Sequence, residues 1–120
     1  MSESQRPPGK TTISPDVLVT IAGLTALGVP GVSSLAKIPV GVNLIFKNRA
    51  EDGVCVTIDE KTVSIDLYLN FKRDINVRDV SREIQKRVTR AISEMVDMQV
   101  QEINIHVEDI EYKAEHADAQ

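Results

Sequence analysis

Polar side chains of the kinds that bind metal ions alternate along one segment near the C-terminal end of the sequence. They are Glu102, Asn104, His106 and Glu108. In a β-strand, residues at every second position share one face. Imidazole and carboxylate groups are zinc ligands, and Asp66 on a predicted neighbouring strand would add another. A solvated sheet face is polar without any such role, so we expect no metal site.

Cys55 is the only cysteine in the chain. It falls on the polar face of a predicted strand, and no histidine stands in the arrangement that activates a thiolate nucleophile. A single cysteine excludes an internal disulfide framework and indicates a reducing compartment, the cytoplasm. No glycine-rich phosphate loop, catalytic carboxylate pair or Ser-His-Asp arrangement is present, so we expect neither enzyme activity nor a cofactor.

The segment Gly28-Val29-Pro30-Gly31 has the G-x-x-G spacing of the KH domain, in which this loop clamps a nucleic-acid backbone between two helices. Here no clear second helix follows. Glycine and proline also end helices, and we favour that interpretation. A KH-like nucleic-acid-binding module is the alternative function.

Basic residues recur every four positions in a predicted helix. They are Arg78, Arg82, Lys86 and Arg90, with Lys72 and Arg73 at the helix entrance. At about 100° per residue they form one row on the side opposite the apolar stripe, and we take these six residues as candidate partner-binding residues. Glu83 and Glu94 are spaced to pair with Arg87 and Arg90. No aromatic residue in the row can stack on bases, which disfavours nucleic acid as the partner.

Residues 37–49 form an apolar segment with basic ends. It has two interpretations. It presses on a partner or on lipid headgroups, or it packs into the core as an irregular edge strand, which we favour.

Capping residues and apolar spacing predict two helices. Ser14, Pro15 and Asp16 are a helix start, and Val17, Leu18, Ile21, Leu24 and Thr25 then recur at helical spacing. The second helix starts at the cap Asn76. Its predicted buried stripe is Val77, Val80, Ile84, Val88, Ala91, Ile92 and Met95.

Alternating apolar residues predict three strands. Residues 54–59 and 62–71 form a hairpin if Glu60 and Lys61 make the turn, which pairs Ile58 with Val63, Val56 with Ile65 and Val54 with Leu67. In the last strand Ile103, Ile105 and Val107 point inward. A short or irregular strand and then a loop are expected within 32–53.

One polar and one apolar face on each strand require that both helices cover a single side of the sheet. The predicted fold class is therefore α+β, a two-layer sandwich with a small mixed sheet and two helices on one face. We expect a disordered N-terminal tail over 1–10, one domain over 11–111 and a disordered acidic tail over 112–120.

The charge is segregated along the chain. Its net charge is −4 over 120 residues, but residues 61–90 carry 8 basic and 4 acidic groups, and residues 91–120 carry 1 basic and 8 acidic groups. Opposite charge on neighbouring segments suits association with itself or with another protein. Residues 1–10 lack the apolar region of a secretion signal, and no apolar run is long enough for a transmembrane segment.

Several stretches, in this order and spacing, resemble the alkaline shock protein family of bacterial envelope stress response proteins. They are TISPDVLVTIA (12–22), VPGV (29–32), VSIDLYL (63–69), INVRDV (75–80), IQKRV (84–88), EMV (94–96) and VQEINIHV (100–107). The chain departs from the family at Phe71-Lys72-Arg73-Asp74, where a Tyr-Gly pair is common, and at Asp97-Met98, where a glycine is common.

The resemblance implies a small cytoplasmic bacterial protein without catalytic residues. It also implies association with the cell envelope, through self-assembly into a homo-oligomer or through a membrane-anchored protein partner, and a link to stress tolerance. Contact with the membrane would then be peripheral. No active-site residues carry over.

Overall fold

The computed structural model describes residues 13–44 and 47–111 of the chain. The two predicted tails lie outside these described residues. The described elements, in chain order, are α2 (Pro15–Leu27), β1 (Val32–Leu35), β2 (Arg49–Glu51), β3 (Val54–Asp59), β4 (Thr62–Lys72), α3 (Val77–Met95) and β5 (Gln99–Glu111).

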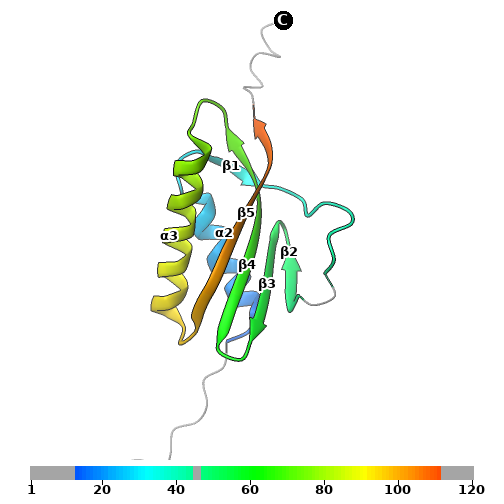
Figure 1. Cartoon of the computed structure of the whole chain (residues 1–120), viewed down its shortest axis with the longest axis vertical. Helices are drawn as coiled ribbons and strands as arrows, with labels where there is room; N and C mark the ends of the chain where they lie inside the picture. The colour runs from blue at the N-terminus through cyan, green and yellow to red at the C-terminus, as the bar shows by residue number, and fades with distance from the viewer. Residues whose placement is uncertain (1–12, 45–46, 112–120) are drawn as a thin grey trace, which may run out of the picture.

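The strands form one mixed sheet centred on β4. Strand β5 runs parallel to β4 along one edge, while β3 and β1 pair antiparallel with successive parts of the other edge, and β2 pairs with β3. Both helices pack on the same face of this sheet, where their buried residues join those of the strands in one core (Figure 1). The predicted α+β two-layer sandwich is confirmed.

The β3–β4 hairpin has the predicted register. Ile58 lies opposite Val63, and the ladder continues through the other two predicted pairs. The two-residue turn forms at Glu60 and Lys61, with Glu60 at a φ of 57°. A tight hairpin turn requires a residue with positive φ, and Glu60 adopts one although glutamate is not favoured there. The alternating pattern of the two strands therefore outweighs an unfavourable turn sequence.

Strand β5 returns parallel to β4 after the crossover helix α3. Ile103 is buried and Ile105 packs against the core. Val107 lies opposite the buried Leu69 but is itself 36% exposed and is not part of the core, so its predicted inward position does not bury it. The apolar alternation continues along the strand beyond the part that the core covers.

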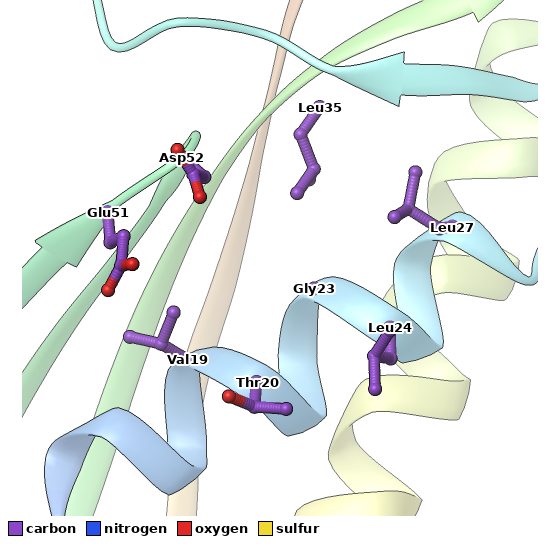
Figure 2. A pocket seen from close by; sticks show the side chains of 8 residues that line it. All are labelled: Val19, Thr20, Gly23, Leu24, Leu27, Leu35, Glu51 and Asp52. Carbon is purple, nitrogen blue, oxygen red and sulfur yellow. The ribbon is translucent and has the colours of Figure 1, made fainter.

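Helix α2 begins and ends where predicted, but its buried face is different. The Ser14 hydroxyl accepts a hydrogen bond from the Asp16 amide, and Gly28 caps the other end. The buried residues are Leu18, Val19, Ala22, Gly23 and Ala26. Leu24 and Val17, part of the apolar repeat in the sequence, are exposed. The small residues Ala22, Gly23 and Ala26 let α2 approach the sheet closely, while the Leu24 side chain points away from it (Figure 2).

Helix α3 is capped by Asn76, whose side chain accepts a hydrogen bond from the Asp79 amide at 3.0 Å. Ile84, Val88 and Ile92 are fully buried. The two ends of the predicted stripe, Val77 and Met95, are 40% and 66% exposed. The stripe was therefore correct in its middle and wrong at both ends.

Between α2 and β3 the chain makes more structure than expected. The short strand is β1, but part of the predicted loop forms β2, which pairs with β3. Ile38 and Val42 pack on a small second cluster formed by Ala36, Cys55 and Tyr68. This segment therefore covers part of the sheet face opposite the helices, which we had expected to be solvated.

Candidate interaction surfaces

The basic row lies on the exposed side of α3. Arg78, Arg82, Lys86 and Arg90 are all exposed, and at 1.5 Å per residue the row spans about 18 Å. Lys72 and Arg73 are exposed beside the start of the helix, at the end of β4 and in the turn that follows. Six cations therefore gather along one helix and its entrance.

The ion pairs around this row are only partly those predicted. Arg87 pairs with Glu83 at 2.6 Å, and Arg73 pairs with the exposed Asp74 at 3.3 Å. Among the described residues no ion pair joins Arg90 to Glu94, nor does one involve Arg78, Arg82 or Lys86. Most of the row keeps its positive charge available to a partner.

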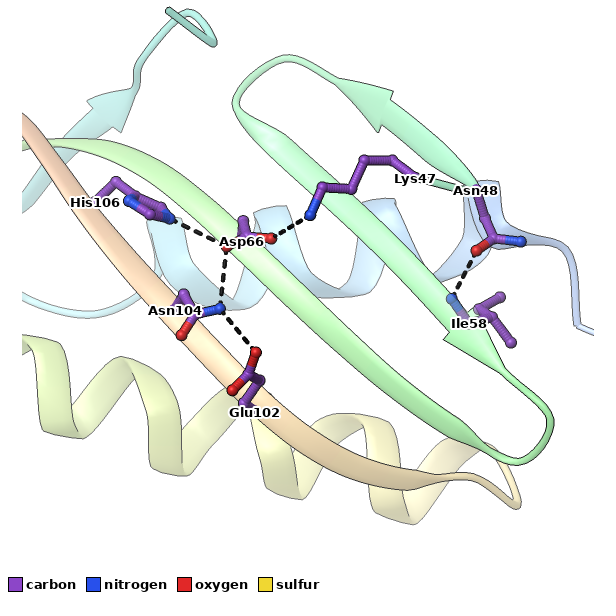
Figure 3. A network of polar contacts seen from close by, with 7 residues as sticks. All are labelled: Lys47, Asn48, Ile58, Asp66, Glu102, Asn104 and His106. Atoms are coloured by element: carbon purple, nitrogen blue, oxygen red, sulfur yellow. Dashed lines mark hydrogen bonds and ion pairs between the residues drawn. The ribbon is translucent and has the colours of Figure 1, made fainter. Parts of the chain in front are cut away.

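A polar network occupies the sheet face opposite the helices (Figure 3). Asp66 on β4 accepts hydrogen bonds from Lys47 at 3.0 Å, from Asn104 at 3.1 Å and from His106 Nε2 at 3.1 Å. The His106 ring stacks on Tyr68 with 4.4 Å between the ring centroids. The network joins three segments, β4, β5 and the residues before β2.

The hydrogen bonds decide the charge state of Asp66. Burial alone would raise the pKa of this carboxyl, but the hydrogen bonds from His106, Lys47 and Asn104 stabilise the ionised form and lower it overall. The same contact with Asp66 raises the pKa of Lys47. The network therefore holds the segment before β2 against the sheet through a charged hydrogen bond.

The candidate metal ligands are brought only partly together. Asp66, Asn104 and His106 adjoin one another, but both Asp66 oxygens already accept hydrogen bonds. The Glu102 carboxylate bonds to the Asn104 amide at 3.3 Å. Within residues 13–44 and 47–111, no group of three His, Cys, Asp or Glu side chains is arranged to hold a metal ion. Sequence reasoning found three of these residues but missed Lys47 and Tyr68, since nothing local marks their long-range contacts.

Cys55 is fully buried beneath the segment that crosses the sheet. Burial raises the pKa of its thiol, and burial also raises the pKa of the neighbouring Tyr68 hydroxyl. A neutral, enclosed thiol packs as a small apolar side chain. Cys55 belongs to the second cluster and has no features of a nucleophile.

The G-x-x-G segment joins α2 to a strand. Gly28 caps α2, and β1 begins at Val32 directly after Gly31. Gly31 has a φ of 106°, and a side chain there would meet Val80 of α3 at 2.8 Å. The glycines therefore end a helix and permit close helix contact, and this segment lacks the second helix of a KH clamp.

The basic ends of the segment 37–49 differ in their contacts. Lys37 is exposed, but Lys47 is bound to Asp66, and Arg49 pairs with Glu51 at 2.6 Å and with Asp16. At the tip between them Val40 is wholly exposed. The favoured interpretation, core packing as an irregular edge strand, is only partly correct: Ile38 and Val42 pack on the second cluster and not in the main core, and residues 37–44 form no strand. None of the described helices has both the length and the apolar character needed to span a bilayer.

Comparison with known proteins identifies the family of this chain. Residues 3–112 match the model of the alkaline shock protein 23 family, which is described as having a cell envelope-related function. The uncharacterised protein Spy1535 of Streptococcus pyogenes serotype M6 is 34% identical over 85% of this chain and 79% of its own length. The uncharacterised protein YqhY of Bacillus subtilis is 28% identical over 93% and 84%. No solved structure matches. The chain belongs to the alkaline shock protein family, whose function is related to the cell envelope.

Proposed function

We propose that this protein is a non-catalytic interaction module of the bacterial envelope stress response, acting from the cytoplasm. It works by self-assembly or by binding a membrane-anchored protein, which would hold it peripherally at the membrane. The basic row on α3, with Lys72 and Arg73, is the contact surface. The observation that carries the proposal is that this row is exposed and that Arg78, Arg82 and Lys86 lack ion pairs among the described residues.

The chemistry of the row favours an acidic protein surface. Exposed cations attract an anionic partner over about one Debye length and set its orientation. The C-terminal quarter of this chain supplies negative charge of this kind, because residues 91–120 carry 8 acidic groups against 1 basic group. A second copy of the chain is therefore one acidic partner, and an acidic segment of a membrane-anchored protein is the other.

Charge reversal in the row tests this proposal. We expect the double variant Arg82→Glu with Arg90→Glu to reduce self-association at low salt, because both positions then repel an acidic surface. Light scattering of the full chain measures it, with Lys61→Glu, an exposed cation outside the row, as the matched control.

Two results separate the alternatives. If the double variant assembles as the wild type does, the basic row has no part in assembly. If a single-stranded RNA binds at low ionic strength and the double variant does not bind it, the row is a nucleic-acid surface and the proposal is wrong.

A further inference from the structure

Strand β5 has one open edge, the side that faces away from β4. It pairs with β4 on one side, and no described strand pairs with its other side. The hydrogen bond from Gln85 to the Ile103 carbonyl shows that the backbone of Ile103 points toward the open edge. Backbone groups of a strand alternate between its two edges, so those of Ile105 and Val107 point the same way. An exposed row of this kind pairs readily with another strand.

The side chains next to this edge are acidic. Glu102 lies on the sheet face opposite the helices, where its carboxylate bonds to the Asn104 amide (Figure 3). Glu108 and Asp109 are exposed further along the strand, and among the described residues no ion pair involves either of them. The strand itself contains neither lysine nor arginine. We call Glu102, Glu108 and Asp109 the acidic edge.

Positive charge lies on the helix side of β5. Arg78 and Arg82 precede Gln85 by seven and three residues, so they share the flank of α3 from which Gln85 reaches β5. On the same side of the sheet Val107, opposite the buried Leu69, leaves an apolar surface that is 36% exposed. A basic side chain brought along β5 is therefore repelled on the helix side and attracted on the outer side.

The cations of the outer face are already engaged with carboxylates. Lys47 and His106 are both hydrogen-bonded to Asp66. Lys72 lies next to Glu111 at the end of the β4–β5 ladder, and we therefore leave Glu111 out of the acidic edge.

These charges exclude several occupants of the open edge. Two copies of β5 pairing antiparallel about Ile105 would place Glu102 opposite Glu108, and like charges directly opposite one another are destabilising. The same pairing would bring the arginine flanks of two α3 helices together. Nucleic acids and anionic lipids carry negative charge, which the acidic edge repels.

We propose that β5 binds an extended segment of another protein, which adds to the sheet as a strand beside Ile105 and Val107. Lysine or arginine alternates with apolar residues in this segment. Its basic side chains then meet the acidic edge and its apolar side chains cover Val107. In strand addition the main-chain hydrogen bonds give affinity, and alternate side chains give specificity. The partner is basic, whereas the basic row on α3 takes an acidic one, so this proposal and the proposed function hold or fail separately.

A synthetic peptide tests the contact. The probe is a fluorescein-labelled peptide in which lysine and valine alternate, added to the full chain and followed by fluorescence anisotropy. We expect saturable binding at low salt that weakens as salt rises. A matched peptide carries N-methyl groups on the amides that would face β5 and should bind at least about tenfold more weakly, because these hydrogen bonds are lost. Absence of binding by the first peptide, or equal binding by the two, would overturn the proposal.

A proline on the open edge tests the same contact from the protein side. Val107→Pro removes an amide that points outward, and edge strands tolerate proline at such positions. We expect about tenfold weaker peptide binding, whereas Val107→Ile keeps the amide and should bind as the wild type does. Circular dichroism checks the fold of each variant. In the wild type the peptide should also slow hydrogen exchange at the Ile105 and Val107 amides, and unchanged exchange there would refute the proposal even if Val107→Pro does not fold.

Charge removal tests the choice of partner. Glu108→Gln with Asp109→Asn should weaken peptide binding several-fold at low salt, with a smaller difference at high salt. The matched control is Glu51→Gln with Asp52→Asn, an exposed pair at the turn between β2 and β3, which should bind as the wild type does. Equal loss in both double variants means that the peptide reads only overall charge, and the proposal is wrong. If the wild type self-associates and Val107→Pro abolishes this, a second copy occupies the edge and the proposal is also wrong.

Discussion

Asp66 links the sheet to the segment that crosses its outer face. Its side chain is only 13% exposed and joins Lys47 to β4. Hydrogen bonds to a charged group contribute about 1.5–3 kcal/mol.

The lowered pKa of Asp66 makes stability depend on pH in a defined direction. The ionised form is favoured by the fold, so its contribution is present above the unfolded pKa of about 3.9 and is lost as the pH falls through the folded value. We expect Asp66→Asn to be less stable at pH 7 by about 1–2 kcal/mol, and to lose less further stability on acidification than the wild type does.

Urea unfolding at pH 7 and at pH 3.5 measures both effects. The matched control is Asp97→Asn, at an exposed carboxylate after α3, which should follow the wild type at both values. Parallel stability loss in wild type and Asp66→Asn on acidification would contradict the role given to this carboxylate.

At the scale of elements, a side chain of α3 hydrogen-bonds to the backbone of the edge strand β5. Strand β5 pairs only with β4 among the described strands, and an unpaired edge invites other strands. The Gln85 amide Nε2 donates a hydrogen bond to the Ile103 carbonyl at 3.0 Å. A helix side chain thus occupies a carbonyl of the β5 backbone.

Removing this hydrogen bond should destabilise the contact between α3 and β5. We expect Gln85→Ala to lower the free energy of unfolding by about 1 kcal/mol and to aggregate faster on mild heating. Ser93→Ala is the control, since it also raises helix propensity at an exposed, uncharged position of α3 outside the basic row. If the two variants unfold in urea and aggregate alike, the Gln85 hydrogen bond does not stabilise the edge of β5.

The elements differ in how well the sequence predicts them. The β3–β4 register follows from strict alternation and a fixed turn, because a slip of one residue would reverse both faces. The buried face of α2 was not predictable in the same way. Its larger apolar residues suggested one side, but close contact with the sheet at Gly23 selected the side with Ala22 and Ala26.

The candidate sites also differ in how well the sequence predicts them. The exposed basic row is a local property of one helix, so helical spacing was enough to place it. The Asp66 network depends on Lys47 and Tyr68, and the contact between Lys47 and Asp66 joins residues 19 positions apart. Such contacts are set by how the segment before β2 folds back, which no local pattern encodes.

At the scale of the whole molecule, one layer carries two exposed surfaces of opposite character. The α3 row is cationic, whereas the exposed side of α2, with Val17, Leu24 and Leu27, is apolar. Low salt strengthens the attraction of an acidic partner to the row, and higher salt screens it.

Strand β4 lies between β5 on one edge and β3 and β1 on the other (Figure 1). At Tyr68, where β3 ends and β1 has not begun, the backbone still bonds to Gly53 and Ala36 at 2.8 and 2.7 Å. Its amide protons are therefore enclosed on both sides along most of the strand. In hydrogen–deuterium exchange we expect the β4 amides to exchange last, through opening of the whole domain. If the β4 amides exchange as fast as those of β2, β4 is not the centre of the cooperative folding unit.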